Sequence, residues 1–196
     1  MRVKSLLILA IIVFIKNLSS QNIDFKILKS INQNEMPCWD KTMRGTSFSV
    51  YPIMPTTVIG IWSQGYFTNN KIMMRNAYKS AISIAIALST ASALKFAINR
   101  TRPYDKYPND IIKRDNAGPY SFPSGHTTAA FATATAMSLS YNKWYITIPS
   151  LAYAGFVGYS RMRLGMHYGT DVFGGIIIGV GSGLITWKID KLLNKK

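Results

Sequence analysis

The chain has 196 residues, enough for one domain of ordinary size but too few for two. Of these residues 48% are apolar and only 16% are charged, against about 25% charged in a typical soluble domain, which favours helices packed against one another or against lipid. The net charge of +15 suits an anionic partner. We expect that partner not to be nucleic acid, because the basic residues stand mostly in short connections between apolar segments rather than among aromatic residues on one face.

Cysteine and histidine are scarce. Cys38 is the single cysteine, which excludes an intrachain disulfide and a site of several thiolates. The two histidines, His126 and His167, are too few for a metal site of several imidazoles. We therefore expect no metal and no cofactor, and any histidine chemistry must use these two residues.

The first 20 residues have the pattern of an export signal. Two positive charges within residues 1–4 precede an apolar run over 5–15, and a polar stretch with small residues follows Lys16. A secretory signal has this order, and the run is short for a membrane span of about 20 residues. We expect cleavage near Ser20, with an uncleaved anchor as the alternative, and one helical domain over 21–196. In both cases the domain starts outside the cytoplasm.

The remaining chain predicts helices. Within 21–44 the spacing of Ile23, Ile27, Leu28 and Ile31 is typical of an amphipathic helix. Further apolar segments follow at 48–67 (interrupted by Pro52 and Pro55), 77–98, 127–141, 144–159 and 171–187. No alternating strand pattern is present. The fold class predicted is all-α, a compact bundle of about five to six helices.

Charge placement favours a bundle embedded in a membrane. If residue 21 lies outside, the connection between 67 and 77 lies inside; Lys71, Arg75 and the nearby Lys79 are there without an acid. The tail over 188–196 is also basic, whereas the outer loop over 99–122 mixes both signs. This agrees with the positive-inside rule. Glycines within 171–187 would let helices approach closely.

Two groups of residues could bind an anion at the outer end of this bundle. Lys95 and Arg102 are seven residues apart, two turns on one helical face, and Pro103 then ends the helix. Alone, such a pair is typical of surface charges. Ser124, Gly125 and His126 precede the next helix. They could simply cap it, but a helix N-terminus with a hydroxyl and a glycine amide also binds anions.

A third group adds a nucleophile. His167 and Asp171 are spaced i, i+4, so the carboxylate can accept a hydrogen bond from one ring nitrogen and leave the other free to attack. Arg161, a bidentate ligand for oxyanions, lies nearby in the sequence. The topology brings all three groups to one end of the bundle. Three cations, helix-end donors, two histidines and a carboxylate indicate phosphoryl transfer by positioning and charge stabilisation.

The chain resembles the type 2 phosphatidic acid phosphatase and vanadium haloperoxidase superfamily in three ordered motifs: Lys95-x6-Arg102-Pro103, Pro123-Ser-Gly-His126, and Ser160-Arg161-x5-His167-x3-Asp171. No functional position departs from the family pattern. The motifs occupy 95–171, and the helix layout extends the likeness over about 48–188.

The resemblance implies a role for each residue. His167 is similar to the nucleophile that takes the phosphoryl group, and Asp171 to the residue that orients it. His126 is similar to the acid that protonates the leaving oxygen and later activates water. The phosphate cradle implied consists of Lys95, Arg102, Arg161, the Ser124 hydroxyl and the Gly125 amide.

We therefore expect a metal-independent phosphatase that hydrolyses lipid phosphate monoesters or diphosphates through a phosphohistidine. The expected partners are a phosphorylated lipid and a membrane, and the expected location is a bacterial inner membrane with the site facing the periplasm. Two alternatives keep the same site: a soluble exported acid phosphatase of broad substrate range, and a vanadate-dependent haloperoxidase. A non-enzymatic helical membrane protein would require all three motifs to be coincidental.

Overall fold

The computed structural model describes residues 17–33 and 36–194, with side chains from residue 23 onward. Most of the predicted signal segment, residues 1–16, lies outside the described residues. Residues 17–20 form the first turn of a helix, and this does not test whether the chain is cleaved near Ser20.

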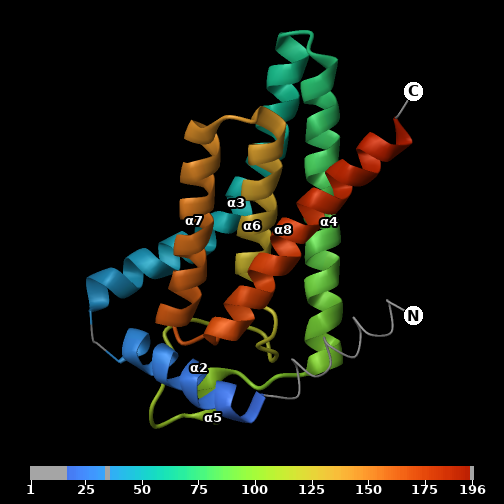
Figure 1. The fold of residues 1–196 in the computed structure, drawn as a ribbon. Helices are drawn as coiled ribbons and strands as arrows, with labels where there is room; N and C mark the ends of the chain where they lie inside the picture. The colour runs from blue at the N-terminus through green and yellow to red at the C-terminus, as the bar shows by residue number, and fades with distance from the viewer. Residues whose placement is uncertain (1–16, 34–35, 195–196) are drawn as a thin grey trace, which may run out of the picture.

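The described residues form seven helices and no strand (Figure 1). One isolated antiparallel bridge joins Thr101 to Tyr120. The all-α prediction is confirmed, and the helix beyond the predicted six is the single turn after Pro103. The helices are α2 (Asn17–Asn32), α3 (Pro37–Phe67), α4 (Lys71–Ile98), α5 (Pro103–Lys106), α6 (Gly125–Tyr141), α7 (Trp144–Arg163) and α8 (Gly169–Leu193).

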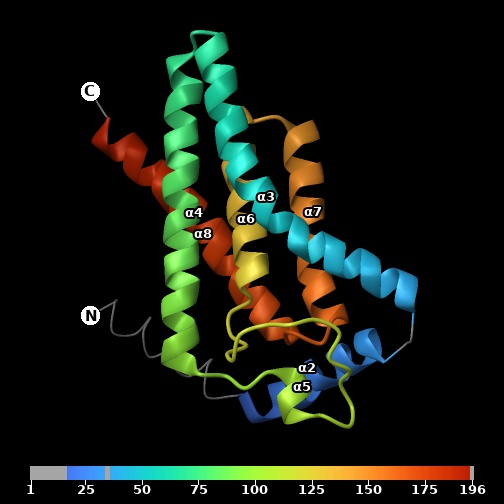
Figure 2. The ribbon, with the colours of Figure 1, turned by 180° about the vertical axis from the view of Figure 1, so that it is seen from behind.

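Helix α3 continues through both internal prolines, which the sequence analysis expected to interrupt it. Pro52 and Pro55 each lack an N–H, so the helix loses backbone hydrogen bonds there. The hydroxyl of Thr56 donates to the Pro52 carbonyl at 2.7 Å, which satisfies one acceptor. The result is a change of direction rather than an end (Figure 2). The first part of α3 extends away from the bundle and the second part runs beside α4.

Small residues form the centre of the bundle. Helix α6 contacts α3, α4, α7 and α8, and its buried residues are mostly alanine and threonine. A Cβ placed on Gly179 of α8 would lie 2.6 Å from the Thr128 carbonyl oxygen and 2.8 Å from the Ala132 nitrogen. The backbones of α6 and α8 therefore approach more closely than any side chain at this position would allow. This confirms the expected packing role of the glycine-rich segment.

Many of the large apolar side chains of α4 and α8 point outward. Helices α4 and α8, of 28 and 25 residues, are long and apolar enough to cross a bilayer. Only 22% and 33% of their most apolar windows are buried, whereas the core helix of a soluble protein would be mostly buried. Their exposed residues include Ile82, Ile86, Phe173, Ile177 and Leu184. The described chain is thus a membrane-type bundle with a small-residue interior and a bulky apolar exterior.

Four helix ends meet at one end of the bundle: the C-termini of α4 and α7 and the N-termini of α6 and α8 (Figure 1). The segment 99–124 and helix α2 cover this end. The prediction that Lys95 and Arg102 share one helical face is wrong. Helix α4 ends at Ile98, Asn99 adopts a left-handed conformation (φ 51°), and Pro103 begins α5 rather than ending α4. The two cations still face the same cavity, because the chain turns back over the bundle end.

The α6–α8 contact predicts unequal effects for two glycines of α8. Gly179→Ala should lower the free energy of unfolding by about 1–3 kcal/mol, because the added methyl group meets backbone atoms that cannot move separately. Gly181→Ala, where nothing lies within 4 Å of the new Cβ, should be neutral or stabilising by up to about 1 kcal/mol. Thermal unfolding in detergent measures both, and equal midpoints would contradict the close approach.

Candidate active site

A cavity of about 570 Å³ opens among the four helix ends. Six of the eight predicted site residues line it: Lys95, Arg102, Gly125, His126, Arg161 and His167. The other two, Ser124 and Asp171, are fully buried directly behind the lining. The structure thus brings all three motifs together. Six of their residues form the cavity wall, and two lie behind it.

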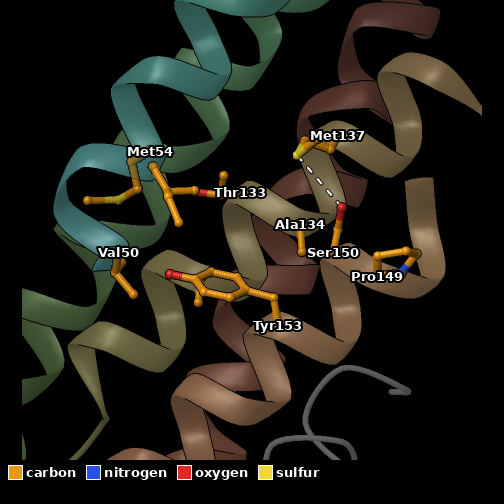
Figure 3. A pocket seen from close by; sticks show the side chains of 10 residues that line it. Val50, Met54, Thr133, Ala134, Met137, Pro149, Ser150 and Tyr153 are labelled. Atoms are coloured by element: carbon orange, nitrogen blue, oxygen red, sulfur yellow. Dashed lines mark hydrogen bonds between the residues drawn. The ribbon is translucent and has the colours of Figure 1, made fainter. Parts of the chain in front are cut away.

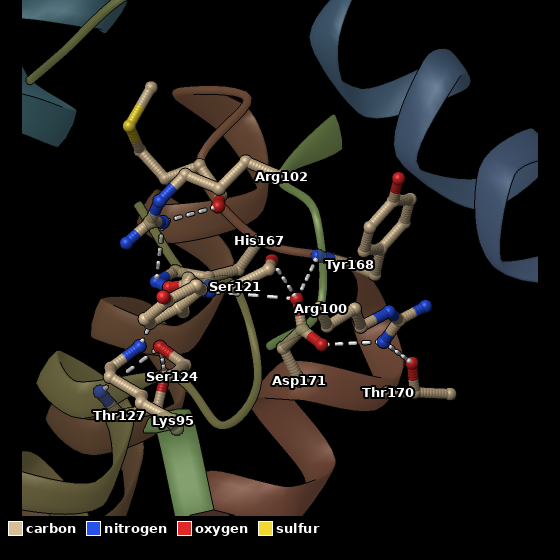
Figure 4. A network of polar contacts seen from close by, with 12 residues as sticks. Lys95, Arg100, Arg102, Ser121, Ser124, Thr127, His167, Tyr168, Thr170 and Asp171 are labelled. Atoms are coloured by element: carbon tan, nitrogen blue, oxygen red, sulfur yellow. Dashed lines mark hydrogen bonds and ion pairs between the residues drawn. The ribbon is translucent and has the colours of Figure 1, made fainter. Parts of the chain in front are cut away.

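His167 stands between α7 and α8, and Asp171 lies in the first turn of α8. The Asp171 Oδ2 atom accepts the Tyr168 backbone N–H at 2.9 Å and the Ser121 hydroxyl at 2.5 Å (Figure 4). The same oxygen lies 3.5 Å from the His167 Nδ1 atom, at the outer limit of hydrogen bonding. Both side chains are almost completely buried, so the pair is shielded from water.

The second ring nitrogen of His167 faces a cation. The Arg102 Nη1 atom lies 3.3 Å from Nε2. A guanidinium can only donate, so Nε2 must carry a lone pair, which places the proton on Nδ1, toward Asp171. Burial lowers the pKa of His167 to about 3, and this effect outweighs the opposing effect of the Asp171 carboxylate. His167 is therefore a neutral imidazole whose Nε2 lone pair lies on the cavity side, next to Arg102.

Backbone carbonyls fix two of the three cations. Arg102 donates from Nε to the Gly118 carbonyl at 2.5 Å and from Nη1 to the Met166 carbonyl at 2.7 Å. Lys95 donates from Nζ to the Tyr120 carbonyl at 3.0 Å. These carbonyls are neutral acceptors, so both positive charges remain available to an anion.

Arg161 is held differently. Its Nη1 atom donates to the Ser47 hydroxyl at 2.6 Å and to the Asp115 carboxylate at 2.8 Å. Its side chain is 1% exposed, and its Nε atom is buried without a hydrogen-bond partner. An unsatisfied buried N–H of a charged group is costly, and an anion in the adjacent cavity would satisfy it.

Ser124 begins α6. Its hydroxyl accepts the Thr127 backbone N–H at 3.5 Å and contacts the Thr127 hydroxyl at 2.8 Å. Its own N–H donates to the Asp171 carbonyl at 3.0 Å, which joins the starts of α6 and α8. The capping interpretation therefore holds for Ser124, while a direct role for its hydroxyl in binding phosphate stays a prediction.

Gly125 and His126 form the first residues of α6 at the cavity wall. The Lys95 Cε atom lies 3.9 Å from where a Gly125 Cβ would stand, so the lysine crosses close to this helix end. The His126 ring contacts Tyr51 edge to face, with 5.2 Å between ring centroids. The two histidines thus come from different helix ends and line the same cavity.

Several residues of the site were not identified from the sequence. Ser47 and Asp115 hold Arg161, Ser121 holds Asp171, and Tyr51 contacts His126. A further residue, Arg100, donates to Asp171 at 2.5 Å. Each of these contacts joins residues that are 46 to 114 positions apart in the sequence. Several of the residues also lie in the loop over 99–122, where helical periodicity does not predict which side chains face each other. Within the described ranges no three His, Cys, Asp or Glu side chains gather as metal ligands would.

A second cavity of about 260 Å³ adjoins the first, between α3, α6 and α7. Val50 and Met54 line both cavities. Figure 3 shows the second cavity surrounded mainly by apolar groups, among them Ala134, Met137 and Tyr153. The two cavities therefore share part of their wall.

The fold and the site define a class: a helical membrane-type bundle whose one end holds a neutral histidine beside three cations. Comparison with known families agrees. Residues 77–195 match the family model of the PAP2 superfamily, and the chain belongs to that family.

Curated relatives carry the names of phosphatases. A lipid A 1-phosphatase of Porphyromonas gingivalis is 30% identical over 66% of this chain and 27% of its own length. An undecaprenyl-diphosphatase of Sulfolobus acidocaldarius is 28% identical over 56% of this chain and 52% of its own length. A lipid A 4'-phosphatase of Bacteroides thetaiotaomicron is 26% identical over 86% and 77%. The chain thus spans about a quarter and a half of the first two relatives.

Solved structures share the fold. LpxE of Aquifex aeolicus superposes with a TM-score of 0.70 at 26% identity, over 83% of this chain and 93% of that one. A transmembrane PAP2 type phosphatidylglycerolphosphate phosphatase of Bacillus subtilis superposes with a TM-score of 0.77 at 24% identity, over 97% and 95%. The two structures share the helical fold of this chain, in which two helices are long and apolar enough to cross a membrane.

The buried environment of His167 predicts its protonation state. With a pKa near 3, about 1% of this imidazole carries a second proton at pH 5, where a histidine in water is mostly charged. Because the chain has two histidines, ¹⁵N-histidine NMR of the protein in detergent resolves both, and His126→Gln leaves one signal set to assign. An imidazolium spectrum for His167 at pH 5 would contradict this environment.

Proposed function

We propose that this protein is a metal-independent phosphatase that hydrolyses lipid phosphate monoesters or diphosphates at the extracytoplasmic face of a membrane, through a phosphohistidine at His167. The observation that carries the proposal is the neutral, buried His167, whose Nε2 lone pair faces a cavity lined by Lys95, Arg102 and Arg161.

The proposed reaction has two steps. His167 Nε2 attacks phosphorus, the bond to the leaving oxygen breaks, and protonated His126 gives its proton to that oxygen. Burial, and after it the charge of Arg161, lowers the pKa of His126 to about 3, so His126 gains this proton together with the bound anionic substrate. The Asp171 carboxylate stabilises the positive charge that develops on the imidazole. Water then attacks the phosphohistidine, His126 accepts its proton, the P–N bond breaks, and inorganic phosphate leaves.

The cradle supports this chemistry. Phosphoryl transfer needs charge placed in advance around the equatorial oxygens. The Nε donor of Arg161 is unsatisfied, and Arg102 and Lys95 are held by neutral carbonyls. The Gly125 amide stands at the N-terminus of α6, where helix donors favour an anion. Substrate phosphate would complete the donors that the protein leaves open.

A lipid substrate is supported by the apolar cavity that shares Val50 and Met54 with the site, and by the names of the relatives. Phosphatidic acid, phosphatidylglycerophosphate, a polyprenyl diphosphate and lipid A all present a phosphate on an apolar chain. A phosphate-release screen over these four lipids and one soluble ester distinguishes them. The export pattern of 1–20 and the basic inner connections support the extracytoplasmic side.

A soluble exported phosphatase is the alternative location. The membrane-embedded protein should stay with membranes after a carbonate wash, whereas release into the supernatant would favour the soluble alternative.

His167→Ala should reduce phosphate release in EDTA by at least about 10³-fold, because the nucleophile is lost while the cradle remains.

In His126→Ala, the labelled phosphoryl group should accumulate on the protein as an acid-labile, base-stable adduct. Vanadate should inhibit the unaltered protein. Arg75→Met, at the far end of the bundle, is the matched control for handling and folding. Full activity of the His167→Ala protein would contradict the mechanism.

Filling the apolar cavity should separate lipid from soluble substrates. Ala134→Phe places a ring in this space, so KM for a long-chain lipid phosphate should rise about 10-fold while turnover of p-nitrophenyl phosphate stays within about 2-fold. Ala152→Phe adds the same group on the exposed face of α7 and should change neither. Equal losses for both substrates in the Ala134→Phe protein would show that the cavity does not hold the chain.

A further inference from the structure

Arg100 lies behind the catalytic pair rather than in front of it. It belongs to the connection between α4 and α5 and does not line the active-site cavity. Its guanidinium stacks over the Tyr168 ring, with 4.1 Å from Cζ to the ring centroid, and its side chain is 25% exposed on the other side of the pair. Substrate in the active-site cavity would therefore not touch it.

The two oxygens of Asp171 have different partners (Figure 4). Oδ2 faces His167 Nδ1 and accepts from Ser121 and the Tyr168 backbone. Oδ1 accepts from Arg100 Nη1 at 2.5 Å. Because Asp171 is fully buried, loss of Arg100 would leave Oδ1 without this charged donor and the carboxylate freer to rotate. Arg100 thus fixes which oxygen faces the histidine.

Helix α2 in turn holds Arg100. Asp24 of α2 is 5% exposed, and its Oδ2 atom accepts from Arg100 Nη2 at 3.0 Å. Asp24 also accepts the Thr170 backbone N–H at 3.0 Å and the Thr170 hydroxyl through a short contact. Thr170 accepts from Arg100 Nη1 at 2.7 Å. The three side chains form a closed hydrogen-bonded group that anchors α2 to the first turn of α8.

We propose that Arg100, held by Asp24, is a positioning residue for the reaction at His167: it fixes the Asp171 carboxylate so that Oδ2 faces Nδ1. This inference rests on the proposed function. It extends the active site to Asp24 of α2, 76 positions before Arg100 in the sequence, and to a residue at one of the unspecified positions of the Lys95-x6-Arg102 motif. The chemical step, rather than phosphate binding, depends on the group.

Arg100→Met and Arg100→Lys test it, with p-nitrophenyl phosphate as substrate and vanadate as a probe of the cradle. Arg100→Met should lower kcat about 10- to 100-fold, while KM and the vanadate inhibition constant change less than about 3-fold. Arg100→Lys should recover part of kcat, because one donor can still reach Oδ1. Arg75→Met breaks a more exposed Arg–Asp ion pair, to Asp190, at the far end and should leave kcat unchanged.

A double-mutant comparison tests the role of Asp24. Asp24→Asn should lower kcat about 3- to 10-fold in the unaltered background and have little further effect in Arg100→Met, because Asp24 acts through Arg100. Independent, multiplying losses would contradict that chain of contacts. Thermal unfolding of each variant identifies loss of folded protein.

Three results would overturn the inference: unchanged kcat in Arg100→Met, a loss confined to KM and vanadate binding, or a kcat loss that matches the fraction unfolded. Failure of the proposed function would give a different result from failure of this inference. The unaltered protein would then lack phosphatase activity, or its activity would survive the His167→Ala substitution.

Discussion

The structure of the active end depends on one buried carboxylate. Asp171 has four partners: Oδ2 binds the Ser121 hydroxyl and faces His167, Oδ1 binds Arg100, and the backbone carbonyl accepts the N–H of Ser124. A buried charge is tolerated only when it is paired and hydrogen-bonded. The need to satisfy Asp171 therefore fixes the loop over 99–122, the start of α6 and the orientation of the histidine together.

The cost of burying charge also bears on the two arginines of the cavity. Arg102 and Arg161 are both almost fully buried and near each other's charge, which is costly without compensation. Neutral carbonyls hold Arg102, and Asp115 neutralises only part of the charge around Arg161. A net positive field remains in the cavity. Such a site is pre-organised for an anion, because its donors need little rearrangement when the anion binds.

The sequence predicted the fold class, the membrane-type exterior and six of the residues that line the cavity, because these leave local signals. Apolar segments, small residues and motif spacing are all visible in the chain itself. Helix lengths were underestimated: polar residues at helix ends, such as Lys71 and Arg163, interrupt the apolar pattern without ending the helix. The bend of α3 was predicted as an interruption of the helix. A proline in the sequence indicates that backbone hydrogen bonds are lost, but it does not indicate whether tertiary packing keeps the helix continuous.

The supporting residues could not be predicted. Ser47 and Asp24 lie on the first helices of the chain, yet they contact side chains more than 70 positions later. Their partners are set by how α2 and α3 lie across the bundle end, which is a property of tertiary packing. The prediction that Lys95 and Arg102 share one helical face failed for a similar reason, because the path of the chain after α4 is set by tertiary packing. Both residues reach the cavity, but through a left-handed residue at Asn99 rather than through helical periodicity.

The arrangement of the two cavities supports the amphiphilic substrate that we propose. A phosphate bound between Lys95 and Arg161 would occupy only the charged part of the first cavity, and the second cavity beyond Val50 and Met54 would have no use in binding it. A molecule with a phosphate on a hydrocarbon chain fills both spaces at once. Burial of the chain contributes free energy remote from phosphorus, and this binding energy can be used to hold the phosphate in line with His167.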